Sequence, residues 1–197
     1  MSTITGFDEK TNGWNKAIVQ KMGGVEIADA FLRGEFVLTK VAQAVQKLFT
    51  HVTGLNFPGL PAFNINDFFT KKNTKVKFYD IGSNFKSWFG DMEVATTEAQ
   101  KLSLDRLKQN SYDPDIIKEI GDENCNQSLA VIRWHIESGQ ANKGSWYGGY
   151  FLDKSGSRRA VYWDWDVGGW GVYAFEVPSS DRWNVGREFV SRKPLVA

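Results

Sequence analysis

The sequence predicts a soluble α+β protein, with a helical N-terminal part over residues 1–54 and a mixed α+β part over residues 55–197. Two patterns carry this prediction. Apolar residues recur every three or four positions early in the chain, whereas aromatic and β-branched runs separated by turn residues lie near its end. With 197 residues, the chain is long enough to bury a core without disulfides or metals.

The N-terminal part is expected to form helices. Trp14, Ile18 and Met22 share one helix face, and a second short helix is expected between Val25 and Gly34. The clearest amphipathic pattern covers residues 36–52, where apolar side chains step by three and four: Val37, Val41, Ala44, Val45, Leu48, Phe49 and Val52. The glycines and prolines of residues 54–61 predict a loop at the boundary between the two parts.

The middle of the chain is expected to mix one strand with three helices. Phe78 to Gly82 is typical of a strand that ends at glycine. Helices are predicted from Thr97 to Gln109, from Pro114 to Ile120 and from Gln127 to Glu137. Thr97 is suited to cap the first helix, and Asp113-Pro114 offers a cap and a first-turn proline to the second.

The C-terminal region predicts an antiparallel β-meander of three to four strands rich in Trp, Tyr and Phe, within residues 146–190. Its strands are expected at Trp146–Leu152, Arg158–Asp164 and Trp170–Val177, because turn residues separate these runs. The Trp183–Phe189 segment is expected to add a fourth strand or to pack as a closing flap. The predicted helices would pack against this sheet.

Alternation along the middle strand assigns its residues to two faces. Val161, Trp163 and Trp165 lie on one face, and Arg158 and Tyr162 on the other. We expect the two tryptophans to be buried against the predicted helix at residues 127–137. The opposite face is then either a binding surface or a second core layer covered by a helix.

Charge and cysteine content favour a cytoplasmic protein. The formal net charge is +1, so any nucleic-acid role would need a local basic patch. Cys125 is the single cysteine and has no internal disulfide partner. The first ten residues lack the basic leader and apolar run of a signal peptide, and no apolar run is long enough to span a membrane.

Several short motifs resemble a loose group of small, uncharacterised bacterial proteins. They are Met22-Gly23-Gly24, the Phe31–Glu35 run, Ile81-Gly82 and the tail from Asp181 to Arg192. The resemblance implies a bacterial or phage origin. It transfers no activity and no site residues.

No catalytic residue, metal ligand or cofactor site is predicted. His51 and His135 lie outside zinc-binding motifs, and Cys125 lacks a neighbouring imidazole in sequence. The segment from Asp164 to Gly169 is acidic, but it lacks the remaining oxygen ligands of a calcium loop. A hairpin turn is expected there.

The leading hypothesis is a non-enzymatic, intracellular binding or assembly module with a protein partner. Its contact residues would be the arginines and rings that interfaces favour: Arg158, Arg159, Tyr162, Trp170 and Arg182. One alternative is single-stranded nucleic-acid binding, with Lys71–Lys77 and the Arg158-Arg159 pair tracking phosphates. Another is carbohydrate binding or hydrolysis by Glu137, Asp164, Asp166 or Glu176. The sequence leaves the partner and the oligomeric state open.

Overall fold

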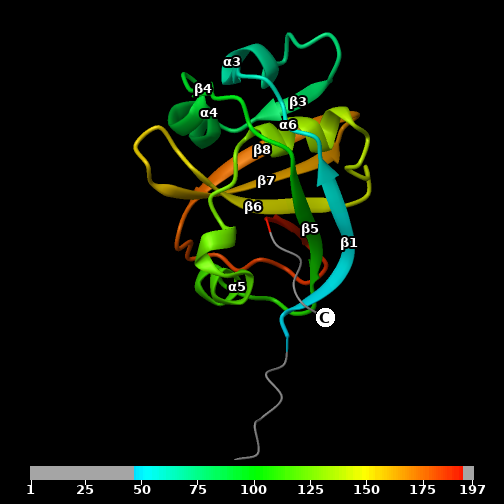
Figure 1. Cartoon of the computed structure of the whole chain (residues 1–197), viewed down its shortest axis with the longest axis vertical. Helices are drawn as coiled ribbons and strands as arrows, with labels where there is room; N and C mark the ends of the chain where they lie inside the picture. The colour runs from blue at the N-terminus through cyan, green and yellow to red at the C-terminus, as the bar shows by residue number, and fades with distance from the viewer. Residues whose placement is uncertain (1–46, 193–197) are drawn as a thin grey trace, which may run out of the picture. The chain divides into compact units, whose positions relative to one another are not determined.

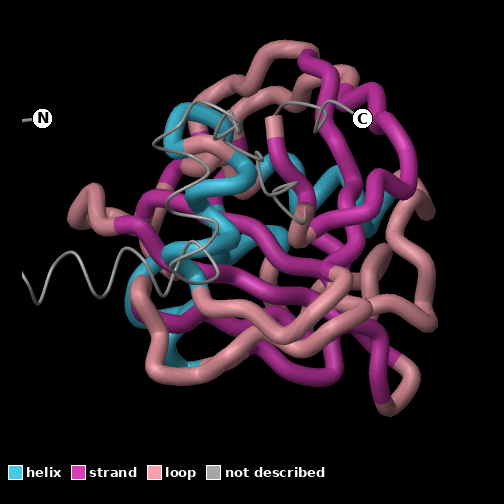
Figure 2. Tube along the Cα trace, turned by 90° about the horizontal axis from the view of Figure 1, so that it is seen from below, coloured by secondary structure: helices cyan, strands magenta, loops and turns pink. Residues whose placement is uncertain are grey.

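A computed structural model describes residues 47–192, which are mostly sheet (Figures 1 and 2). The helices expected between residues 14 and 46 lie outside this range. No helix within it is long and apolar enough to cross a membrane. The elements in chain order are β1 (Phe49–Phe57), β2 (Phe63–Asn64), α3 (Ile65–Phe68), β3 (Phe78–Ile81), α4 (Ser83–Phe89), β4 (Glu93–Val94), β5 (Gln100–Leu107), α5 (Asp113–Ile120), the 3₁₀ helix η1 (Asp122–Asn124), α6 (Ala130–Glu137), β6 (Trp146–Leu152), β7 (Arg158–Asp166), β8 (Gly169–Glu176) and β9 (Glu188–Ser191).

Seven strands form one mixed sheet in the order β1-β5-β9-β6-β7-β8-β3. The β6–β9 and β3–β8 pairs are parallel, and the other neighbours are antiparallel. β2 and β4 form a separate two-stranded sheet. In Figure 1, β6, β7 and β8 cross the middle of the view, with α3, α4 and α6 on one side and α5 on the other.

The predicted fold class is therefore wrong. The described chain is not a set of helices packed on a separate antiparallel meander, but a seven-stranded mixed sheet with four short α-helices between residues 47 and 192. The strands expected from the three aromatic runs are present, yet they form the interior of this larger sheet. The segment Trp183–Phe189, expected to add a fourth strand or to pack as a flap, reaches only the first two residues of β9, which lies between β5 and β6.

Two segments predicted to be helical form β-strands within the described residues. The end of the helix expected over residues 36–52 lies in β1, which also runs through the boundary predicted at residue 54. The helix expected from Thr97 to Gln109 is replaced by β5. β5 pairs with β1 on one side and β9 on the other, so ladder hydrogen bonds on both edges outweigh a helical propensity of a few tenths of a kcal/mol per residue.

Other local predictions are confirmed. β3 lies at the expected strand, α5 follows the Asp113-Pro114 start, and α6 occupies most of the helix predicted from Gln127 to Glu137. The hairpin turn between β7 and β8 has Val167 and Gly168 at φ 47° and 75°. Both central residues thus have the positive φ that a tight hairpin turn requires.

The sheet buries apolar side chains on both faces. On the first face, α3, α4 and α6 enclose the larger core, which includes Phe57, Phe85, Ile132 and Trp163. On the second face, α5 covers a smaller cluster. Its members come from β1, β5, α5, β6, β7 and β9 and include Phe49, Leu107, Ile116, Tyr150, Ala160 and Phe189.

The predicted orientation of β7 is confirmed at its centre. Trp163 is fully buried, and its Nε1–H donates to Nδ1 of His135 on α6 over 3.3 Å. Its ring stacks on Tyr147 at a centroid distance of 5.7 Å. Trp165 is only half-buried, because it lies near the end of β7, where the Lys143 ammonium sits 4.0 Å from its ring centre.

Replacing Trp163 by alanine is expected to lower the free energy of unfolding by about 3 to 5 kcal/mol, because it opens a cavity between the sheet and α6. Urea unfolding followed by circular dichroism measures the change. Val185→Ala, at a side chain that is 58% exposed, serves as the control and should leave the unfolding midpoint almost unchanged. Equal midpoints for the Trp163 variant and the wild type would contradict the orientation of β7.

Candidate functional site

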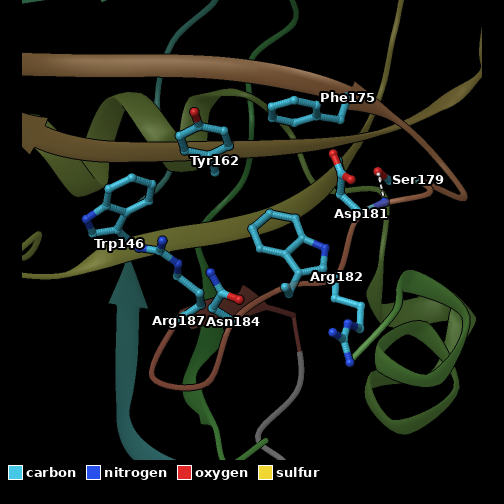
Figure 3. A pocket seen from close by; sticks show the side chains of 10 residues that line it. Trp146, Tyr162, Phe175, Ser179, Asp181, Arg182, Asn184 and Arg187 are labelled. Carbon is cyan, nitrogen blue, oxygen red and sulfur yellow. Dashed lines mark hydrogen bonds between the residues drawn. The ribbon is translucent and has the colours of Figure 1, made fainter. Parts of the chain in front are cut away.

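A pocket of about 330 Å³ opens on the second face of the sheet, beside the cluster under α5. One wall comes from neighbouring strands and carries Trp146, Tyr162 and Phe175. The other wall is the segment between β8 and β9, which contributes Trp183 and Arg187 (Figure 3). The Tyr162 face of β7 is thus covered by α5 only in part, and the remainder lines an open pocket.

The strand wall is a row of stacked rings. Tyr162 stacks on Trp146 at a centroid distance of 5.7 Å and on Phe175 at 5.4 Å, with interplanar angles of 15° and 10°. Tyr173, its cross-strand neighbour on β8, adds a third stacked ring at 4.7 Å. Such pairs contribute about 0.5 to 1.5 kcal/mol beyond area burial, so the wall is ordered before any ligand binds.

A glycine on β6 makes room for the opposite wall. Gly148 lies opposite Tyr162 in the sheet register. A β-carbon at Gly148 would lie 3.0 Å from the indole of Trp183 and 3.2 Å from the ring of Phe189. Any larger residue would therefore displace Trp183, and the missing side chain allows the indole to lie directly on the sheet.

The buried carboxylate of Asp113 fixes the segment that carries Trp183. Its Oδ1 accepts hydrogen bonds from Trp183 Nε1–H at 2.7 Å and from the Tyr150 hydroxyl at 2.9 Å, and its Oδ2 accepts from the Ser179 amide at 2.9 Å. Burial, followed by the Asp113 charge, raises the pKa of Tyr150 well above its usual value. The sequence suggested that Asp113 caps α5, but its side chain points inward and links three elements instead.

Arg187 completes the pocket at the Trp146 end. Its guanidinium carbon lies 3.5 Å from the centre of the Trp146 ring, a close cation–π contact. The backbone of Arg187 is held as well, because its carbonyl accepts from the Leu107 amide at 2.8 Å. Burial lowers the pKa of Arg187, while the charge of Asp164 opposes this shift.

Asp164 is the acidic group whose charge acts on Arg187. It is 2% exposed, and its Oδ1 has no hydrogen-bond partner in the described part of the chain. Burial raises its pKa, the neighbouring charge of Asp166 adds to the rise, and Arg187 lowers it. Asp164 lies opposite Trp146 in the sheet register, on the Tyr162 face of β7, and forms no ion pair with Arg187 within 4 Å.

Two of the five residues predicted to contact a partner line this pocket, namely Tyr162 and Arg182. Arg158 projects from the same face of β7 but lies elsewhere. It donates to Asp122 and to the side chain of Asn126, each at 2.7 Å. The structure thus places Arg158 beside η1, where its charge is already paired.

The other two predicted contact residues belong to the first face. Arg159 donates to Asp153 at 2.7 Å and lies over the ring of Trp88 at 4.1 Å. Trp170 is 5% exposed and packs edge-on against Trp165 in the larger core. Alternation along each strand carries both side chains away from Tyr162.

The remaining charged groups considered in the sequence do not line the pocket. Lys71, in the lysine-rich run between α3 and β3, approaches Asp80 at 3.6 Å. Glu137 pairs with Arg133 at 3.0 Å, and Glu176 lies 3.8 Å from an Arg159 nitrogen. Across residues 47–192, no three His, Cys, Asp or Glu side chains are grouped to hold a metal ion.

A Ser–His–Asp set lies on β1 and β5 but lacks the geometry of a catalytic triad. Nδ1 of His51 is 2.9 Å from Asp105 and 3.1 Å from the hydroxyl of Ser103. A triad needs the serine on one imidazole nitrogen and the carboxylate on the other. Here both contact the same nitrogen, and Ser103 is fully buried, so this set does not provide an activated nucleophile.

Sequence reasoning missed Arg187, Asp113 and the anchoring of Trp183. The sequence predicts a fourth strand or a closing flap around Trp183, but it does not indicate the hydrogen bond of its indole to Asp113. Arg187 follows Gly186 in a turn, and nothing in the local sequence indicates that its side chain contacts a ring on β6.

Comparisons with protein-family models, with curated proteins and with solved structures found no match.

Replacing Asp113 by asparagine is expected to lower the free energy of unfolding by about 2 to 4 kcal/mol. The asparagine side chain keeps one acceptor oxygen, but its NH₂ group is a donor. That group would face a second donor, either the Ser179 backbone N–H or the Trp183 indole N–H. Urea unfolding measures the loss. The control is Asp115→Asn, an exposed position in the first turn of the same helix. A loss no greater than that of the control would contradict the anchoring role.

The thiol of Cys125 is expected to be unreactive in the folded protein. It is 3% exposed, and burial raises its pKa to about 11, so at pH 8 only about a thousandth of it is thiolate. Iodoacetamide should therefore leave the native protein unmodified and label it fully in urea, as read by intact mass. Rapid stoichiometric labelling without urea would contradict this burial.

Proposed function

We propose that the protein is a non-enzymatic binding module that captures a segment of a protein partner in the pocket between Trp146 and Phe175. The observation that supports this function best is the combination of a preordered aromatic wall and an arginine, Arg187, that no carboxylate among residues 47–192 pairs. Rings and arginine are the residues that dominate binding energy at protein interfaces. The pocket volume of about 330 Å³ suits one large side chain with its immediate neighbours.

Arg187 differs from most of the described arginines because it has no ion-pair partner among residues 47–192. Within residues 47–192, Arg106, Arg133, Arg158 and Arg159 each have a carboxylate within 4 Å. Arg182, Arg187 and Arg192 have no such partner in that range, and the first two of these line the pocket. A partly desolvated guanidinium gains from an external acceptor, because its fork of donors matches a carboxylate or a backbone carbonyl.

Charge and ring geometry favour a protein partner over the two alternatives. The arginine pair expected to track phosphates is already paired with carboxylates on opposite faces of β7. Both faces of Tyr162 are covered by stacked neighbours, so it offers little flat surface to a base or a sugar. Glycoside hydrolysis needs two carboxylates flanking the bound sugar, and of the pocket-lining residues only Asp181 carries one.

A peptide selection tests the proposal. The full-length protein is immobilised and a displayed library of random peptides is selected against it, after which affinities are measured by fluorescence anisotropy. Phe175→Ala removes one ring of the wall and should weaken the selected peptides at least about tenfold, a loss of about 1.4 kcal/mol.

Leu152→Ala is the matched control, because Leu152 is a similarly exposed apolar residue on β6 outside the pocket. It should leave the affinities unchanged. Failure to enrich any peptide, or equal effects of the two variants, would overturn the proposal. So would self-association in sedimentation that Phe175→Ala abolishes, since the occupant would then be a second copy of the chain.

A further inference from the structure

The pocket carries opposite charges at its two ends. Arg187 and Asn184 lie at the end formed by Trp146, and Asp181 and Ser179 lie at the end formed by Phe175 (Figure 3). The rings of the strand wall and the Trp183 indole occupy the space between. An occupant therefore meets a cation, then apolar surface, then an anion.

The Arg187 end is built to receive an acidic group. The Trp146 ring covers one face of the guanidinium at 3.5 Å and leaves its N–H edge free, since hydrogen bonds leave along the guanidinium plane. The acidic group whose charge acts on Arg187 is Asp164, which is buried on the Tyr162 face of β7 and lies beyond ion-pair distance. A ligand carboxylate can thus form the bidentate pair that no described residue supplies.

The Asp181 end is built to receive a basic group. The Asp181 amide donates to the Ser179 hydroxyl at 3.0 Å, which orders the turn. Its carboxylate has no cationic partner within 4 Å among residues 47–192. The adjacent Arg182 does not neutralise it, because its guanidinium points away from Asp181 and lies 5.9 Å from the centre of the Tyr112 ring (Figure 3).

We propose that the partner segment places one large apolar or aromatic side chain between an acidic and a basic side chain, with the acid on Arg187 and the base on Asp181. This specificity rests on the proposed function, because it names the partner of the same pocket. A polyanion is disfavoured, since Asp181 would repel its second charge. Fixed charges at both ends also set the direction in which the segment lies.

Four fluorescein-labelled peptides test the proposed charge order. Each has a central tryptophan with one charged residue on either side, and the flanking pairs are Glu/Glu, Lys/Lys, Glu/Lys and Lys/Glu. Anisotropy titrations with the full-length protein should show that one of the two mixed peptides binds about tenfold more tightly than either like-charged peptide. Raising the salt concentration should reduce this preference, because the charges are partly exposed.

Exchanging the two pocket charges should reverse the preferred order. The double variant Arg187→Glu with Asp181→Lys keeps the net charge and should select the other mixed peptide. The control double variant, Lys101→Glu with Glu98→Lys, makes the same exchange at exposed positions outside the pocket and should retain the wild-type order.

The outcomes separate this inference from the function on which it rests. If all four peptides bind equally, or the exchanged variant keeps the wild-type order, the charge inference is overturned while the binding module stands. If none of the four binds although library-selected peptides do, the charge inference is again overturned. If no library peptide binds either, the proposed function fails as well.

Discussion

The pocket depends on one buried carboxylate. Taking an aspartate out of water is costly unless donors replace its hydration, and Asp113 has three of them from elements far apart in sequence. Satisfying that one group brings the start of α5, the strand β6 and the segment after β8 together. The position of Trp183 follows from this requirement rather than from apolar contact alone, because its indole N–H is one of the three donors.

The sheet assigns separate roles to its faces through strand alternation. Val161 and Trp163 point to the larger core, and Ala160 and Tyr162 point to the face that α5 covers only in part. Helices α3, α4 and α6 lie on the first face, whereas α5 lies on the second (Figure 1). The remainder of that second face is closed by a loop instead, and a loop held at a few points leaves an open pocket where a helix would have filled it.

Local signals in the sequence predicted some of this arrangement. Turn residues between the aromatic runs identified β6, β7 and β8, and alternation oriented Trp163 correctly. β5 was missed because Leu104 and Leu107 fit a helical spacing of three, while Leu102 and Leu104 fit a strand spacing of two, and only pairing with distant strands decides between them. Arg187 was missed for the same reason, since its ring contact joins the segment before β9 to Trp146 on β6, which lies 41 residues earlier in the sequence.

The alternation of β7 also has an evolutionary consequence. Substitutions at Tyr162, Trp146 or Phe175 change the surface that the pocket presents to a partner. Val161 and Trp163, one position away from Tyr162 along β7, lie in the larger core and stabilise the fold. On this strand, recognition and folding thus depend on adjacent residues. A lineage that changed partners would be expected to keep Val161 and Trp163, together with the buried Ala160 and Asp164, and to vary Tyr162.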